Sequence, residues 1–548
     1  MVNPAIETKN LSYQYPGSST NAVINANLAI PHGSFCALIG PSGSGKSSLL
    51  FLLRGFYKEF GGQLQGTIKI LGRDIKNDSI ATLGQTVGIV FQNPALQLHQ
   101  LRVIDEVASA PMYHGLPYKE CQTRATNLVD KFLGKDFYSR SPADLSGGEQ
   151  QKTALAASLS LNAEILLLDE PFSFLDQNAA HDLVRHLVDL HRQGKTIIVA
   201  THDLDLISDV ATQIVVIKDG DLVLQGPPKK VFYSDLLSSI LPPPLFVQAS
   251  QKLKLTDRPL SWQGLLPKTT ARRTRTNKTL SPTSRPLLSL KNVSFIYPDS
   301  HRGIKSVSVN VNKGEIFGLI GANGSGKTTL AKLIIGLLRP QSGQVFLDNT
   351  NVTHLPIHQR ARSIGYVTQD PLDMFFETDL WKEVAAGPRF LGLPDPKSLA
   401  HQTLQELNLW KYKDVHPDSI SGGEKSLLGL ADIFVFNPMV LLLDVPEFGL
   451  DPKNWEKITT ALRKFQAAGK TIIVITHNLE AAFFLCDTIG VVADGSLLKV
   501  AAPLEIFTNE ALLKKAGLSS LPFSPLLKNI PNNVALTKEL FLNSLKIK

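Results

Sequence analysis

Cysteine is scarce and long apolar runs are missing from this chain of 548 residues. The three cysteines, Cys36, Cys121 and Cys486, lack the spacing of a disulfide framework or a zinc site. No stretch approaches the roughly 18 consecutive apolar residues that a membrane-spanning helix needs. The first residues show no basic segment followed by an apolar core, as a signal peptide would. We therefore expect a protein that is made and kept in the cytosol.

An excess of positive charge is present but modest. The 56 Lys and Arg residues against 48 Asp and Glu residues give a formal net charge of +8. Such an excess suits either nucleic acid or an anionic membrane surface. One basic cluster has no interleaved aromatic residues, so base stacking gains no support. We interpret it as a solvated linker and expect no nucleic-acid partner; its residues are Arg272, Arg273, Arg275, Lys278 and Arg285.

The length suits two domains, and an internal repeat divides the chain in that way. Lys46 and Lys327 lie 281 positions apart in two copies of one motif, and Asp169 and Asp444 lie 275 positions apart. A period this long indicates repeated domains rather than a solenoid. We predict a first domain at 1–244, a linker and tail at 245–286, a second domain at 287–520 and a C-terminal extension at 521–548. Within the extension, residues 536–545 are expected to form a packing or dimer-contact helix.

Each copy alternates short β-rich runs with amphipathic segments of helical length. Glycine-rich loops follow the strands and open helices. This alternation predicts an α/β fold in which helices flank a mostly parallel sheet.

The two glycine-rich segments match the phosphate-loop pattern in the context that the pattern requires. Backbone N–H groups of such a loop surround the β-phosphate, and the helix N-terminus adds partial positive charge. The lysine reaches the β- and γ-phosphate oxygens, and the Ser or Thr hydroxyl binds Mg²⁺. We therefore predict that ATP and Mg²⁺ are bound by Gly40, Pro41, Ser42, Gly43, Ser44, Gly45, Lys46, Ser47 and Ser48, and by Gly321, Ala322, Asn323, Gly324, Ser325, Gly326, Lys327, Thr328 and Thr329.

One apolar strand in each copy ends in an aspartate, Asp169 or Asp444, which we expect to hold Mg²⁺ together with Ser47 or Thr328. The next residue of the first copy is Glu170, whose carboxylate can polarise an attacking water. The second copy has Val445 there, which has no titratable group. The nearby Glu447 is a poor substitute because the intervening proline fixes the local path. We predict one hydrolytic site and one degenerate ATP site.

A serine, two glycines and a glutamate precede each aspartate strand and open a helix, as in an anion-binding turn. Together with the phosphate loops, these segments resemble the ATP-binding subunits of ABC transporters. The resemblance covers almost all of residues 5–240 and 287–520. It implies two tandem P-loop ATPase domains, each with a mainly parallel sheet core, a β subdomain, a helical signature subdomain and a short C-terminal extension.

The resemblance also implies roles for individual residues. The adenine would stack on Tyr15 and Tyr297. Gln92 and Gln369 would be Q-loop residues at the Mg²⁺, and Asp176 and Asp451 would belong to the D-loops. His202 and His477 would be the switch histidines at the γ-phosphate, and Gln92, Glu170 and His202 would form the catalytic set. The signature residues would contact ATP held by the opposite domain; they are Ser146, Gly147, Gly148 and Glu149, and Ser421, Gly422, Gly423 and Glu424.

Residues 91–98, Phe-Gln-Asn-Pro-Ala-Leu-Gln-Leu, with the segment 103–108 that follows, resemble energy-coupling-factor ATPases. Those proteins power the uptake of vitamins and transition-metal ions. The resemblance implies a transmembrane coupling protein and a small integral-membrane substrate-binding protein as partners. It further implies peripheral attachment to the cytoplasmic face of the cell membrane and a head-to-tail pseudo-dimer of the chain's own two domains.

Two alternatives stay open. A soluble tandem ABC ATPase acting on ribosomes or nucleic acid would account for the positive charge and the two complete phosphate loops. The absence of an Asn-His-Leu-Asp D-loop and of a long charged helical linker argues against it. A non-enzymatic pair that only senses ATP is the other alternative, and Glu170 with the full set of first-site motifs argues against that.

Overall fold

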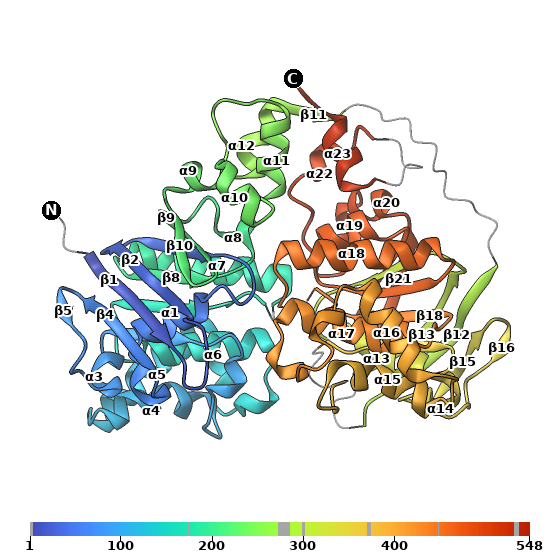
Figure 1. The fold of residues 1–548 in the computed structure, drawn as a ribbon, viewed down its shortest axis with the longest axis horizontal. Coiled ribbons are helices and arrows are strands. Elements are labelled where there is room, and N and C mark those ends of the chain that lie inside the picture. The colour runs from blue at the N-terminus through green and yellow to red at the C-terminus, as the bar shows by residue number, and fades with distance from the viewer. Residues whose placement is uncertain are drawn as a thin grey trace. The chain divides into compact units, whose positions relative to one another are not determined.

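The computed structural model describes residues 4–173, 175–271, 285–298, 302–369, 374–447, 449–530 and 536–548. The predicted basic cluster lies outside these residues, apart from Arg285. The chain divides into two compact units, Met1–Ser261 and Trp262–Lys548 (Figure 1). The boundary falls inside the stretch 245–286 that the sequence marks as linker and tail. Among the described residues, no helix combines the length and apolarity needed to cross a membrane.

The first unit is built on one sheet with the strand order β5-β4-β1-β2-β10-β9-β3-β8-β7-β6. Strands β6, β7, β8, β3 and β9 run parallel, whereas β1, β2, β4 and β5 pair antiparallel as a β subdomain. The strands are β1 (Pro4–Gln14), β2 (Val23–Pro31), β3 (Phe35–Ile39), β4 (Gln63–Ile70), β5 (Arg73–Asp74), β6 (Val87–Val90), β7 (Ile165–Asp169), β8 (Thr196–Ala200), β9 (Gln213–Lys218) and β10 (Asp221–Gly226).

The helices of this unit separate into two groups. Helices α4, α5 and α6 pack together as a helical subdomain, and the others lie on the sheet or follow its last strand. They are α1 (Lys46–Leu53), α2 (Tyr57–Phe60), α3 (Ile80–Gly84), α4 (Val103–Tyr113), α5 (Tyr118–Phe132), α6 (Gly147–Leu159), α7 (Gln177–Arg192), α8 (Leu204–Ile207), α9 (Pro228–Phe232), α10 (Asp235–Ile240) and α11 (Leu245–Lys252).

The second unit repeats this plan with two separate sheets. One has the parallel order β17-β18-β19-β14-β20 with antiparallel β21 at its edge, and the other has the order β13-β12-β15-β16. The strands are β12 (Pro286–Ile296), β13 (Gly303–Asn312), β14 (Ile316–Ile320), β15 (Ser342–Leu347), β16 (Thr350–Asn351), β17 (Ile364–Val367), β18 (Val440–Asp444), β19 (Thr471–Ile475), β20 (Thr488–Ala493) and β21 (Ser496–Ala501).

Helices α15, α16 and α17 form the helical subdomain of the second unit. Its helices are α12 (Trp262–Leu265), α13 (Lys327–Ile335), α14 (Ile357–Arg360), α15 (Leu380–Phe390), α16 (Pro396–Glu406), α17 (Gly422–Phe434), α18 (Pro452–Ala467), α19 (Leu479–Leu485), α20 (Pro503–Phe507), α21 (Glu510–Lys515), α22 (Ser524–Leu527) and α23 (Lys538–Ser544).

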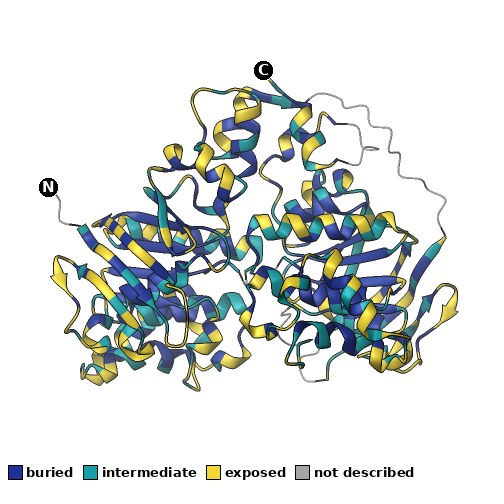
Figure 2. Ribbon diagram, viewed as in Figure 1, coloured by how far each residue is buried: buried dark blue, intermediate teal, exposed yellow. Residues whose placement is uncertain are grey.

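The central parallel strands of both units are buried along their length (Figure 2). Their near-continuous apolar sequences fit strands that helices cover on both faces. The parallel sheet with flanking helices that the alternating pattern predicts is therefore present twice. Each parallel sheet places the ends of its strands beside a phosphate loop.

The C-terminal extension packs against residues of the predicted linker 245–286. Strand β11 (Thr269–Ala271) pairs antiparallel with β22 (Leu545–Ile547). The Trp262 ring lies 5.2 Å from the Phe523 ring and 6.2 Å from the Phe541 ring, measured between centroids. The predicted helix at 536–545 forms α23, and its Phe541 is fully buried, so this helix packs within its own unit.

Asp432 lies in helix α17 of the second unit, and its carboxyl group faces the interior. Both of its oxygens are buried and have no hydrogen-bond partner among the described residues. Burial, and to a lesser extent the charge of Glu383, raises the pKa of Asp432 well above its ordinary value. The corresponding residue of the first unit is Ala157.

We predict that Asp432→Ala raises the free energy of unfolding of the second unit by about 1–3 kcal/mol, the cost of burying an unsatisfied polar group. A folded-state pKa above the unfolded one penalises the ionised form, so the gain is largest at neutral pH. It shrinks as the pH falls toward about 4, the ordinary aspartate pKa. Urea unfolding at several pH values measures it, and a destabilised variant at pH 7.5 would contradict the prediction.

Candidate active site

Both phosphate loops connect a buried strand to a helix, as predicted. The first links β3 to α1 and the second links β14 to α13. Glycine is required at the first position of each loop because a Cβ on Gly40 would lie 2.1 Å from the Ile217 carbonyl oxygen. A Cβ on Gly321 would lie 2.3 Å from that of Val492. The neighbouring strand thus holds each loop in place.

The two loop lysines are buried and bond to their own loops. Lys46 Nζ donates to the carbonyl oxygens of Gly40 (3.0 Å) and Pro41 (3.2 Å). Lys327 Nζ donates to those of Gly321 (2.8 Å) and Ala322 (2.9 Å). Each ammonium group therefore lies inside the loop that would surround a phosphate.

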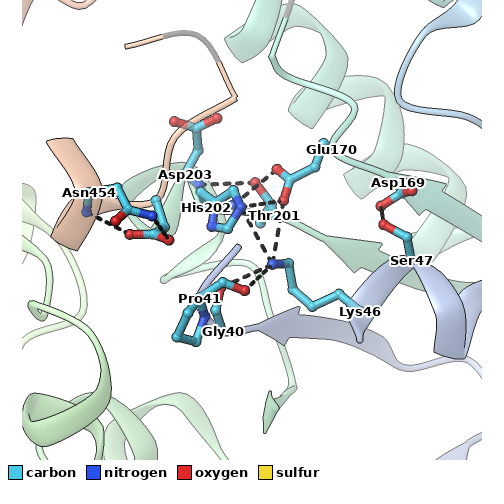
Figure 3. A network of polar contacts seen from close by, with 11 residues as sticks. Gly40, Pro41, Lys46, Ser47, Asp169, Glu170, Thr201, His202, Asp203 and Asn454 are labelled. Carbon is cyan, nitrogen blue, oxygen red and sulfur yellow. Dashed lines mark hydrogen bonds and ion pairs between the residues drawn. The ribbon is translucent and has the colours of Figure 1, made fainter. Parts of the chain in front are cut away.

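In the first unit, Lys46, Glu170 and His202 come together in one polar network (Figure 3). Glu170 Oε1 lies 3.1 Å from His202 Nε2 and 3.9 Å from Lys46 Nζ. Its Oε2 accepts the His202 backbone N–H at 3.1 Å. Burial raises the pKa of Glu170 to about 8 against the lowering effect of Lys46, and the charges of Asp169 and Asp203 add to the rise. A carboxyl group of this kind is a proton acceptor of increased strength.

The metal-site candidates are also adjacent. Ser47 Oγ donates to Asp169 Oδ1 at 2.9 Å. In the second unit, Asp444 Oδ2 accepts a bond of 3.3 Å from the Tyr366 hydroxyl, and Asp444 Oδ1 is buried without a partner among the described residues. Burial raises the pKa of Asp169 and of Asp444.

Val445 occupies the same backbone position as Glu170. Glu170 has φ 44° and donates its N–H to the Ala200 carbonyl oxygen at 2.9 Å. Val445 has φ 49° and donates to the Ile475 carbonyl oxygen at 2.8 Å. A β-branched residue in this left-handed region is strained, yet the turn is unchanged. The units therefore differ here in chemistry and not in backbone path.

The signature segments cap helices α6 and α17. Ser146 and Ser421 are the N-cap residues, and each forms a capping box with the glutamate three residues later. The Glu149 carboxylate accepts the Ser146 N–H at 2.8 Å, and the Glu424 carboxylate accepts the Ser421 N–H at 3.0 Å. These glutamates fix the start of each helix.

Several of the remaining predicted residues have contacts that fix their own position. Tyr15 Oη donates to Ser48 Oγ at 3.2 Å, and Asp176 and Asp451 cap helices α7 and α18. Gln92 is half-buried and Gln369 is exposed. Over the described residues, no hydrogen bond joins either glutamine to Asp169 or Asp444. Tyr297 lies next to Phe295, with ring centroids 4.9 Å apart.

Sequence reasoning missed the role of Tyr366 and the bonding partners of Glu447 in the second unit. Tyr366 takes part because β17 and β18 pair in parallel with Tyr366 opposite Leu442; the first unit has Ile89 opposite Leu167. Glu447 bonds to residues after β19 rather than pointing to solvent. Aligning the two copies residue by residue would have marked both as differences.

The comparisons with known proteins agree with this geometry. Residues 23–173 and 304–447 match the ABC transporter family. A putative ABC transporter ATP-binding protein of Lactiplantibacillus plantarum is 32% identical over 544 residues, covering 95% of this chain and 95% of that protein. One from Bacillus thuringiensis subsp. konkukian is 34% identical over 517 residues, covering 92% of each.

Among solved structures, cbiO1 from Clostridium perfringens, described as part of the ABC transporter complex cbiONQ, is 29% identical with a TM-score of 0.40. The similarity covers 44% of this chain and 99% of that chain. From the family match and the relatives, the chain belongs to the ATP-binding proteins of ABC transporters and is an ATPase with two such domains.

Proposed function

We propose that this chain powers the import of a micronutrient, a vitamin, vitamin precursor or transition-metal ion, through separate membrane proteins. One of its ATP sites hydrolyses and the other binds ATP with slow turnover. The observation that carries the asymmetry is the pair Glu170 and Val445, which share one backbone geometry and differ in the carboxylate. The resemblance of residues 91–98 and 103–108 to energy-coupling-factor ATPases supports the class of cargo.

Glu170 is the general base of the first site in this proposal. Its carboxylate takes a proton from water while the water oxygen bonds to the γ-phosphorus and the bond to the bridging oxygen of ADP breaks. His202, 3.1 Å from Glu170, would bond to the γ-phosphate, and Lys46 would leave its loop carbonyls for the phosphate oxygens. Lys46, Glu170 and His202 thus come from the segments that follow β3, β7 and β8.

The donor sets fit Mg²⁺. Ser47 and Asp169 provide oxygen ligands 2.9 Å apart, and Asp444 has a buried oxygen with no partner among the described residues. Hydroxyl and carboxylate oxygens are the ligands that Mg²⁺ prefers. Ser47 with Asp169, and Thr328 with Asp444, would hold the ion, which neutralises charge on the β- and γ-phosphates when bound. Gln92 and Gln369 stay predicted additional ligands.

The second site keeps its binding residues and lacks the base. Lys327 and Asp444 occupy positions like those of Lys46 and Asp169, but Val445 cannot accept a proton. ATP would therefore stay bound there through many cycles. The pairing of each site with the signature segment of the other domain stays a prediction that the family resemblance makes.

Matching exposed aromatic residues support membrane-protein partners. Tyr113 ends α4 and is 83% exposed, and Phe390 ends α15 and is 74% exposed. They are equivalent positions, because buried Glu106 and Glu383 cap the preceding loops in the same way, each accepting two backbone N–H bonds. Large exposed apolar side chains that recur at one place are typical of a protein contact.

We predict that Tyr113→Glu combined with Phe390→Glu lowers recovery of the membrane partners at least about tenfold, since interface aromatics often contribute 2 kcal/mol or more. ATP binding should be unchanged. Leu236→Glu, at another exposed apolar residue, is the matched control. Co-purification from gently solubilised membranes measures the effect, and full recovery with the double variant would exclude this docking surface.

Mass spectrometry of the proteins that purify with the tagged chain tests the proposed function itself. Recovery of a transmembrane coupling protein and a small integral substrate-binding protein is the expected result, and the latter would identify the cargo class. Recovery of ribosomes instead would overturn the import proposal in favour of a tandem ATPase acting on ribosomes.

A further inference from the structure

Two positions just after the aspartate strands β7 and β18 differ between the units: one unit has a carboxylate where the other has an apolar residue. The first unit has Glu170 and, two residues later, the buried Phe172. The second unit has the buried Val445 and, two residues later, Glu447, with one buried carboxylate oxygen. The second unit therefore has a carboxylate two residues later in the sequence than the first unit does.

The relocated carboxylate bonds to the segment that carries the switch histidine. The Thr476 hydroxyl donates to Glu447 Oε1, and the Asn478 N–H donates to the same oxygen at 3.4 Å. The two residues that bond to Glu447 thus flank His477 on either side. In the first unit the corresponding His202 N–H is bonded by Glu170. Both carboxylates thus accept a backbone N–H of the segment that carries the switch histidine, that of His202 in the first unit and that of Asn478 in the second.

The segment that carries the switch histidine forms the same turn in both units. The Asp203 N–H donates to Thr201 Oγ1 at 3.0 Å, and the Asn478 N–H donates to Thr476 Oγ1 at 2.9 Å. The change from Asp203 to Asn478 removes a negative charge at the position that contacts Glu447. The second unit thus differs from the first at positions 445, 447 and 478, and all three differences fit a carboxylate at 447 in place of one at 445.

We propose that Glu447 is a positioning residue of the second ATP site: it holds the switch segment 476–478 and so orients His477 toward the γ-phosphate, without acting as a base. The oxygen that accepts from Thr476 and Asn478 is engaged within the protein. The proposal rests on the proposed asymmetry, in which the second site retains ATP. The positioning role of Glu447 explains how a site that has no general base still holds the switch segment 476–478 in an ordered conformation.

The test follows release of radiolabelled ATP from the full chain in a Glu170→Gln background, which removes first-site turnover. Glu447→Phe, which restores the residue type of the first unit, should speed release from the slowly exchanging site about tenfold. Glu447→Gln keeps an acceptor oxygen and should change release less than threefold. Glu505→Ala, at an exposed glutamate paired with Lys499, is the matched control.

Rescue separates positioning from a general structural effect. Val445→Glu with Glu447→Phe recreates the first-unit pair and should restore slow release or produce hydrolysis of the retained ATP. Unchanged release with Glu447→Phe, or no rescue by the pair, would overturn the positioning role. Should no ATP be retained even with Glu447 intact, the asymmetric model would fail instead.

Discussion

Glu170→Gln is expected to lower steady-state ATP hydrolysis by at least about 100-fold, the contribution typical of a general base. The carboxylate follows the end of β7 and lies 3.1 Å from His202 Nε2, and in the proposed mechanism it accepts the proton from water. Glutamine keeps the size and the acceptor oxygen that bonds the His202 N–H. The loss would therefore report chemistry rather than folding.

Val445→Ala is the matched change in the second unit. It removes two methyl groups from a buried turn of the same backbone conformation, and hydrolysis should stay within about twofold of the unchanged protein. Phosphate release measured under saturating ATP compares the two variants. Similar losses from both would contradict the asymmetric account.

Phe523→Ala is expected to destabilise the second unit by about 3–5 kcal/mol, the usual cost of removing a buried phenyl ring. Phe523 is fully buried, and its ring lies within 5.8 Å of the rings of Trp262, Phe484 and Phe541. Phe484 belongs to α19, which begins two residues after His477. Loosening this cluster should therefore also weaken ATP retention at the second site.

Tryptophan fluorescence is the suitable probe, because all four tryptophans lie in the second unit, at positions 262, 381, 410 and 455. Unfolding in urea followed by this signal reports that unit without contribution from the first. Phe390→Ala, at an exposed ring, should change the midpoint little. An unchanged midpoint for Phe523→Ala would mean that the aromatic cluster does not stabilise the unit.

The sequence predicts the phosphate loops and aspartate strands well because their patterns depend on local geometry. A loop that must wrap a phosphate needs glycine where Gly40 faces the Ile217 carbonyl, and a strand covered on both faces must be apolar. The order of strands in each sheet does not follow from such patterns. It depends on pairing between residues far apart, such as Ile165 with Thr196.

Contacts across strands and chain segments were the least predictable features. The bond from Tyr366 to Asp444 depends on the register of β17 beside β18. The attachment of Trp262 to the C-terminal extension depends on aromatic packing between segments separated by the whole second domain. The sequence suggested a linker there because proline and basic residues surround a stretch too short to show periodicity.

The central claim is that two bound ATP molecules have different fates. The most direct measurement is a single-cycle experiment in which the chain is loaded with radiolabelled ATP, separated from free nucleotide, and analysed for bound ATP, bound ADP and released phosphate. The account predicts two nucleotides per chain, of which one is hydrolysed and one remains ATP, with hydrolysis abolished by Glu170→Gln. Hydrolysis of both nucleotides at similar rates would contradict it.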